Sequence, residues 1–231
     1  MYGINSLEKF LIFFIENNYS FRSFEEDLNS KNKIINLRHD IDFSLEEALK
    51  IAILENKINI KANYFIMLTS NTYNPLSQYN QDIIKQIKEL GHNISLHFDP
   101  EAYQDIDNGL INEKEIFERY FQVKIKLVSL HRPGKFLNNN NRKLPNVDHT
   151  YQDKYFKSMC YYSDSAGVDI RKKIDLNTKQ NIKKQFHILI HPIWWTNVTS
   201  SPTETLLKWI KLHEEFIILE TKKNCKSFLY N

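Results

Sequence analysis

The sequence predicts an α/β fold of parallel strands joined by helices, and two observations support this prediction. Short apolar segments alternate along the 231 residues with longer segments whose apolar residues recur at helical spacing. Such alternation is typical of βαβ units. Five of the apolar segments end in a polar cluster, and four of the eight histidines lie at these ends. Because the carboxyl ends of parallel strands meet at one rim, we favour a barrel over an open doubly wound sheet.

Local signals predict the individual elements. The predicted strands are segments 34–42, 62–68, 93–99, 125–134, 157–167 and 186–195, and the predicted helices are 1–18, 43–57, 83–90, 113–121 and 204–216. Ser44 and Glu47 form an S-x-x-E capping box at the start of the second helix. Asn80 is the candidate cap of the third helix, and Gly91 is its expected stop. The Asn-rich segment 135–150 is expected to be a loop.

The composition indicates a single domain over residues 1–231. The 42% of hydrophobic residues suffice for one core, and a net charge of +3 without an arginine-rich run argues against nucleic acid. The two cysteines form no CxxC pair, which argues against a disulfide scaffold. No stretch approaches the ~18 apolar residues of a membrane span, and the early run LIFFI is too short for a signal peptide. We therefore expect a cytoplasmic protein without membrane insertion.

The tips of two predicted strands carry the residue types of a metal site. Residues two apart on a strand share a face, so Asp40 and Asp42 should point the same way, with Arg38 behind them. His97 and Asp99 share a face at the tip of another strand. Two neighbouring carboxylates repel unless a positive group lies beside them, and here that group is an arginine or a divalent cation. Histidine combined with carboxylates is the ligand mix of zinc or another first-row metal.

Four motifs in chain order, HDID, GHNISLHFDP, HRPG and LIHP, resemble those of one known family. This family is the polysaccharide deacetylases, carbohydrate esterase family 4, also called the NodB homology domain. The similarity spans residues 34–195, and the HDID wording is closest to deacetylases of O-antigen and capsule gene clusters. The resemblance implies a distorted (β/α) barrel of about seven strands, with the N-terminal and C-terminal helices packed on it.

The resemblance also implies roles for five residues. Asp40 matches the catalytic base, and Asp42 takes the part of the metal-binding aspartate. His97 matches the first metal histidine. Arg132 matches the arginine that orients the base, and His191 matches the histidine that acts as the acid.

The third metal ligand is where the sequence departs from the family. The position of the family's second metal histidine, four residues after the first, holds Glu101. Asp99, on the same face as His97, is our main candidate for the missing ligand, and Glu101 is the alternative. A ligand from another segment, such as His131, is also open.

Three further residues are candidates for substrate binding. Trp194 and Trp195 follow the last motif, and aromatic faces stack on sugar rings, although core filling explains them equally well. Asp164 is placed to hydrogen-bond the substrate or to shape the turn before Gly167.

The sequence thus predicts a metal-dependent N-deacetylase that hydrolyses the acetamide of an N-acetylated sugar, with zinc as the expected metal. Without a signal peptide, the expected substrate is a nucleotide-linked or lipid-linked precursor of surface polysaccharide. The Lys- and Asn-rich segment 135–143 is a candidate for holding a pyrophosphate, or it is a solvated surface feature. The alternatives are a catalytically degenerate barrel that binds saccharide and a metal-dependent hydrolase of another amide or of a phosphoester.

Overall fold

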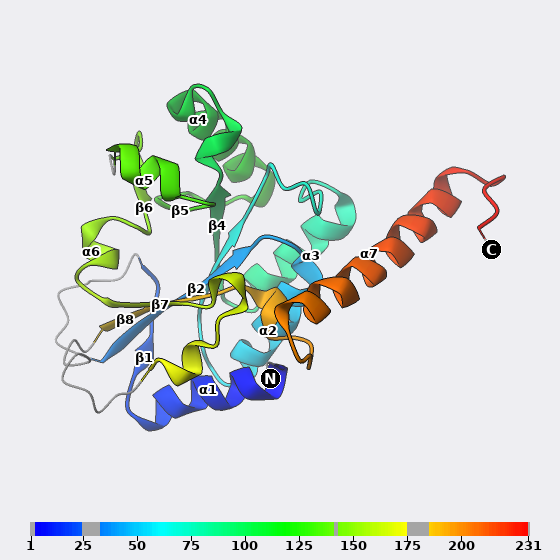
Figure 1. Cartoon of the computed structure of the whole chain (residues 1–231). Coiled ribbons are helices and arrows are strands. Elements are labelled where there is room, and N and C mark those ends of the chain that lie inside the picture. The colour runs from blue at the N-terminus through cyan, green and yellow to red at the C-terminus, as the bar shows by residue number, and fades with distance from the viewer. Residues whose placement is uncertain (1–2, 25–32, 141–142, 175–184, 231) are drawn as a thin grey trace.

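The computed structural model of the chain describes residues 3–24, 33–140, 143–174 and 185–230. Its centre is a parallel sheet in the order β6-β5-β4-β3-β2-β8-β7, with β1 paired to β2 (Figure 1). The strands are β1 Ser20–Phe21, β2 Ile34–Ile41, β3 Asn63–Ile66, β4 Asn93–Phe98, β5 Leu127–Leu130, β6 Asp148–His149, β7 Cys160–Ser163 and β8 Gln185–Ile190. The sheet curls into an open barrel, which confirms the predicted fold class.

The helices of the described residues are α1 Ile4–Glu16, α2 Leu45–Lys57, α3 Gln78–Glu89, α4 Ile106–Phe121, α5 Gly134–Asn140, α6 Asp153–Phe156 and α7 Pro202–Asn224. Short 3-10 turns are η1 Pro100–Ala102, η2 Ser165–Gly167, η3 Ile170–Lys172 and η5 Pro192–Trp194. Helix α2 packs on β2, and α3 and α4 pack on β4. Helix α7 extends away from the barrel toward the C-terminus (Figure 1).

Strand β2 is buried on both faces along its whole length. Its neighbours β3 and β8 are both parallel to it, so apolar packing surrounds most of the strand. The outward face is polar at one point, where His39 Nε2 lies 2.7 Å from Glu55 Oε1 on α2. Tyr64 on β3 donates to the other oxygen of Glu55, also at 2.7 Å. The inward face carries Arg38 and Asp40, which are both buried.

The local signals are mostly confirmed, with two corrections. Ser44 caps α2 by accepting from the Glu47 backbone N–H at 3.2 Å, as the capping box predicts. Helix α3 begins earlier than expected, because Ser77 is the N-cap and Asn80 supplies the N–H that it accepts. The segment expected to be a loop contains α5 and the short strand β6, which extends the sheet beside β5. No helix in the described ranges is long and apolar enough to cross a membrane.

Glu113 is a carboxylate that α4 buries beneath the turn following β4. Only 3% of its surface is exposed, and Tyr103 donates a hydrogen bond to one of its oxygens at 2.7 Å. Its second oxygen has no hydrogen-bond partner among the described residues. Burial raises the pKa of Glu113 to about 7, and the hydrogen bond from Tyr103 offsets only part of that effect.

This burial makes stability depend on pH. The folded state keeps a proton on Glu113 that the unfolded state, with an ordinary carboxyl pKa of 4.5, has already released. The free energy of unfolding should therefore fall as the pH rises from about 4.5 to about 7. Glu113→Gln lacks this titrating group. From pH 5 to pH 8, the free energy of unfolding of the wild type should therefore fall by about 2–3 kcal/mol more than that of the variant. Urea denaturation of both proteins at both pH values measures the difference, and an equal pH dependence in the two proteins would contradict it.

Candidate active site

The carboxyl ends of β2, β4, β5 and β8 open into one cavity of about 800 Å³. Its lining includes Asp40, Asp42, His97, His131 and His191. These residues come from segments separated by up to 151 positions, and the parallel arrangement of the strands brings their ends to a common rim. The structure thus gathers in one place the polar strand ends that the sequence singled out.

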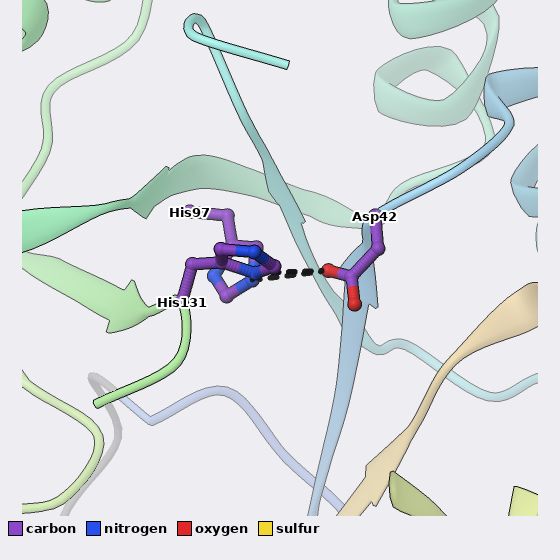
Figure 2. A group of neighbouring side chains, drawn as sticks. All are labelled: Asp42, His97 and His131. Carbon is purple, nitrogen blue, oxygen red and sulfur yellow. Dashed lines mark hydrogen bonds and ion pairs between the residues drawn. The ribbon is translucent and has the colours of Figure 1, made fainter. Parts of the chain in front are cut away.

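Asp42, His97 and His131 form a compact cluster at this rim (Figure 2). His97 Nε2 lies 3.2 Å from Asp42 Oδ1, and His131 Nδ1 lies 3.5 Å from the same oxygen. The two ring nitrogens are 3.2 Å apart. Asp42 Oδ1 is buried, and apart from these contacts with the two histidine rings it has no hydrogen-bond partner among the described residues.

These three atoms fit the coordination shell of a first-row divalent cation. Bonds of 2.0–2.1 Å in tetrahedral geometry put neighbouring ligand atoms about 3.3 Å apart, which is close to the three distances in the cluster. Two imidazoles and one carboxylate also leave one of four positions open, as in catalytic rather than structural sites. The orphaned oxygen of Asp42 would gain a partner in such a site.

Ser129 fixes the tautomer of His97 that metal binding needs. The Ser129 hydroxyl donates to Asp40 Oδ1 at 2.9 Å, and its oxygen accepts from Arg38 at 3.1 Å. Since its one proton is used, the 2.5 Å contact with His97 Nδ1 requires that nitrogen to carry the hydrogen. The neutral ring then presents the lone pair of Nε2 toward Asp42 and His131. A hydrogen bond of this kind on the far nitrogen is the usual support of a metal-ligating histidine.

Arg38, not Arg132, holds the predicted base. Arg38 Nε donates to Asp40 Oδ1 at 2.8 Å, and its Nη2 donates to Asp40 Oδ2 at 2.5 Å. Burial alone would raise the pKa of Asp40, but the charge of Arg38 and its hydrogen bonds outweigh burial and lower this pKa to about 2. Among the described residues, Arg132 has no hydrogen bond or ion pair with Asp40, and its side chain is exposed. The prediction that Arg132 orients Asp40 is therefore corrected.

His191 follows β8, next to β2 in the sheet, and is held by Asp164. The Asp164 carboxylate lies 2.6 Å from His191 Nδ1, accepts from the His191 backbone N–H at 3.0 Å, and accepts from Trp195 Nε1 at 2.6 Å. Burial disfavours the charged imidazolium, but the carboxylate outweighs burial and raises the pKa of His191 to about 9. With Nδ1 engaged, His191 Nε2 faces the cluster, 3.7 Å from Asp42 Oδ2.

Two of the predicted substrate-binding residues have other contacts. Asp164 is fully buried, and its bonds to His191 and Trp195 leave it supporting the histidine. Trp195 is also fully buried, where its ring stacks on Phe10 of α1. Trp194 does line the cavity, as expected for a residue that contacts the substrate.

Asp99 and Glu101 lie outside the cluster. Asp99 lines the cavity, but its carboxylate accepts from the Glu101 backbone N–H at 2.9 Å and caps η1. Glu101 points to the surface and pairs with Lys135 at 3.0 Å. The strand ends at Phe98, so neither residue continues the face of β4 that carries His97. His131, which the sequence left as a third possibility, is the residue that meets Asp42 and His97.

Arg38, Ser129 and the supporting role of Asp164 were missed from the sequence. Arg38 was placed behind the two carboxylates and considered as their partner, but the role of orienting Asp40 was given to Arg132. A signal for Ser129 exists in the sequence, because it lies two residues before His131 and so shares its face. Nothing in the sequence shows that the segment containing Asp164 lies beside the one containing His191.

No protein-family profile matches the chain, and no curated protein matches it by sequence. Its fold is similar to that of several solved structures. A chitin deacetylase from Colletotrichum lindemuthianum shares 13% identity over 80% of this chain and 84% of that one, with a TM-score of 0.46. The peptidoglycan deacetylase PdaC from Bacillus subtilis shares 15% over 82% and 87%, with a TM-score of 0.44. BA3943 from Bacillus anthracis, a CE4 family pseudoenzyme, shares 16% over 80% and 62%, with a TM-score of 0.41.

These three likenesses are distant, and they include both enzymes and a pseudoenzyme. They do not distinguish a catalytic barrel from one that only binds saccharide.

Metal binding distinguishes the candidate ligands. We expect about one equivalent of a first-row divalent metal per chain, with affinity reduced at least about tenfold in His97→Ala and in His131→Ala. Asp99→Asn and Glu101→Gln are the matched controls and should keep the metal, since both side chains have other partners. Elemental analysis after dialysis and titration with cobalt, followed by its visible absorption, measure both quantities. Loss of metal in Glu101→Gln with retention in His131→Ala would reverse the assignment.

Proposed function

We propose that the protein is a metal-dependent N-deacetylase that hydrolyses the acetamide of an N-acetylated sugar to an amine and acetate. The observation that carries this proposal is the spacing of Asp42 Oδ1, His97 Nε2 and His131 Nδ1 at 3.2–3.5 Å. A carboxylate and a histidine lie close to these atoms. Asp40 Oδ2 lies 3.7 Å from His97 Nε2, and His191 Nε2 lies 3.7 Å from Asp42 Oδ2.

The metal is proposed to be zinc, because two imidazoles and one carboxylate with an open position are typical of catalytic zinc sites. When bound, such an ion lowers the pKa of a water molecule and polarises the acetamide carbonyl. The chain's own groups then move the protons. Asp40, kept ionised by Arg38, takes a proton from the attacking water. A low pKa makes Asp40 a weak base, so this step depends on a water that is already acidified.

His191 is proposed as the general acid. Its Nδ1 is held by Asp164, which leaves Nε2 to deliver a proton to the nitrogen of the amide as the carbon–nitrogen bond breaks. The raised pKa of His191 supports this role, because the ring keeps its second proton at neutral pH. The proton taken from water and the proton given to the amine then balance, with acetate as the other product.

The cavity supports a sugar as the substrate. A volume of about 800 Å³ lies in the range of small-molecule sites and accommodates more than one sugar ring. Its lining includes the aromatic residue Trp194 and the hydroxyl residues Thr69, Ser70 and Thr72. Aromatic faces and hydroxyl groups are suited to the two kinds of surface that a sugar presents.

A precursor of surface polysaccharide, linked to a nucleotide or to a lipid, remains our proposal for the physiological substrate. Lys135, at the start of the segment proposed to hold a pyrophosphate, is already paired with Glu101. This pairing reduces the charge that Lys135 offers to a ligand, so the cavity itself is the better place to look for recognition of an anion.

Replacing the base tests the reaction. Asp40→Asn should lower kcat for acetate release from an N-acetylated sugar by about 100-fold or more, because general base catalysis contributes on this scale. The variant should still bind metal, since Asp40 is not in the cluster. Asp99→Asn is the control, because it removes a carboxylate from the same cavity without touching the metal or Arg38. Unchanged acetate release in Asp40→Asn, with metal bound, would exclude the proposed role.

A further inference from the structure

Arg132 is held in an unusual conformation at the edge of the cavity. The backbone N–H of His131 still bonds to Phe98 on β4 at 2.8 Å, and the chain leaves the sheet at the next residue. Arg132 has a φ of 43°, in the left-handed region that few residues other than glycine adopt. Pro133 follows and disfavours the right-handed helical alternative for Arg132. Arg132 directly follows the candidate ligand His131 in the chain, is exposed, and belongs to the lining of the cavity.

The other charged groups of the cavity already have partners. Asp40 is paired with Arg38, Asp42 lies against the two histidines, and His191 is paired with Asp164. Asp99 accepts a backbone N–H in η1. Arg132, by contrast, has no hydrogen bond or ion pair within the described ranges. The cavity therefore presents one cation whose charge is not used by the protein.

The pairing of Arg38 with Asp40 explains why Arg132 is free. The Asp40 carboxylate already accepts two hydrogen bonds from Arg38 and a third from Ser129. A second arginine is therefore not required to orient it. Removing Arg132 should thus leave the base in place. Its position at the cavity edge makes it available for the substrate.

We propose that Arg132 is a specificity-determining residue that binds an anionic oxyacid group, a phosphate or a carboxylate, carried by the substrate. This inference rests on the proposed deacetylase function and adds to it the charge of the substrate. A guanidinium presents parallel N–H donors that match two oxygens of either group. Because Arg132 follows His131 directly, the anionic group lies on the sugar that carries the acetamide or on its immediate neighbour.

The acetamide itself is a poor partner for Arg132. It is neutral, and its carbonyl must lie at the metal cluster, where Asp42 and the two histidines meet. An anion at Arg132 would instead anchor the other side of the ring and hold the acetamide in place. Binding energy from a part of the substrate that does not react is commonly used in this way to orient the reacting group.

Three probes test the proposal by acetate release: N-acetylglucosamine, its 1-phosphate, and N-acetylmuramic acid, which carries a carboxylate. The wild type should show a higher kcat/KM for at least one charged probe than for the neutral sugar. Arg132→Gln should reduce that preference at least about tenfold, as expected for hydrogen bonds to a charged group, with less than about threefold change on the neutral sugar. Arg132→Lys should recover part of it, because it keeps the charge but loses the fork.

Lys135→Gln is the matched control. It removes a neighbouring cation that is outside the cavity lining and paired with Glu101, so it should leave the preference unchanged. Comparison of the phosphate and carboxylate probes shows which anion is recognised. An equal loss on neutral and charged probes in Arg132→Gln, or a wild type without preference, overturns the proposal.

A binding measurement separates this proposal from the proposed function. Calorimetric titration with N-acetylglucosamine 1-phosphate and with N-acetylmuramic acid is carried out in the presence of a chelator, so that the anion cannot bind to a metal. Acetate release is measured separately, with metal supplied. Binding that Arg132→Gln weakens at least about tenfold, in a protein that releases no acetate even with metal, would sustain the anion site and contradict the deacetylase. Acetate release from the neutral sugar, with no binding that depends on Arg132, would do the reverse.

Discussion

The site depends on one buried ion pair, Arg38 with Asp40, inside the barrel. Neither side chain is more than 3% exposed, so each charge would be costly without the other. Their two hydrogen bonds run along the same strand, from residue to residue plus two, and Ser129 adds a third bond from β5. This arrangement consumes the hydrogen of Ser129 and thereby decides which nitrogen of His97 is protonated. The tautomer of His97, and with it the fit of the candidate metal cluster, is thus a consequence of how a buried charge is satisfied.

Sequence reasoning identified the fold class and four residues that the structure brings together, namely Asp40, Asp42, His97 and His191. These were accessible because each is the polar end of an apolar strand, and side-chain alternation shows which faces they share. The third candidate ligand, His131, could not be assigned from the sequence alone. Its position depends on the register between β4 and β5, and α4 lies between these two strands in the chain. That register pairs His97 with Ser129 and leads the chain past them to His131. Arg132 was assigned the role of Arg38 because the family motif points to it, although Arg38 lies only two residues from Asp40 on the same strand.

The two groups that we propose transfer protons, Asp40 and His191, acquire opposite character from their partners. Asp40 is bound to a cation, which favours its ionised form, whereas His191 is bound to an anion, which favours its protonated form. Environments that push two titratable groups apart in this way indicate which is the base and which is the acid. The assignment therefore follows from Arg38 and Asp164, two residues that never need to touch the substrate.

The same pairing determines what remains for recognition. Arg38, Ser129 and Asp164 hold Asp40, His97 and His191 through hydrogen bonds that do not involve the rim of the cavity. The charge of the rim can therefore change without moving these three groups, and Arg132 is the rim residue that we propose binds the substrate. A cation held in a left-handed turn beside a candidate metal ligand would stabilise little in the folded chain by itself. Its conformation is understandable if the missing partner arrives with the substrate.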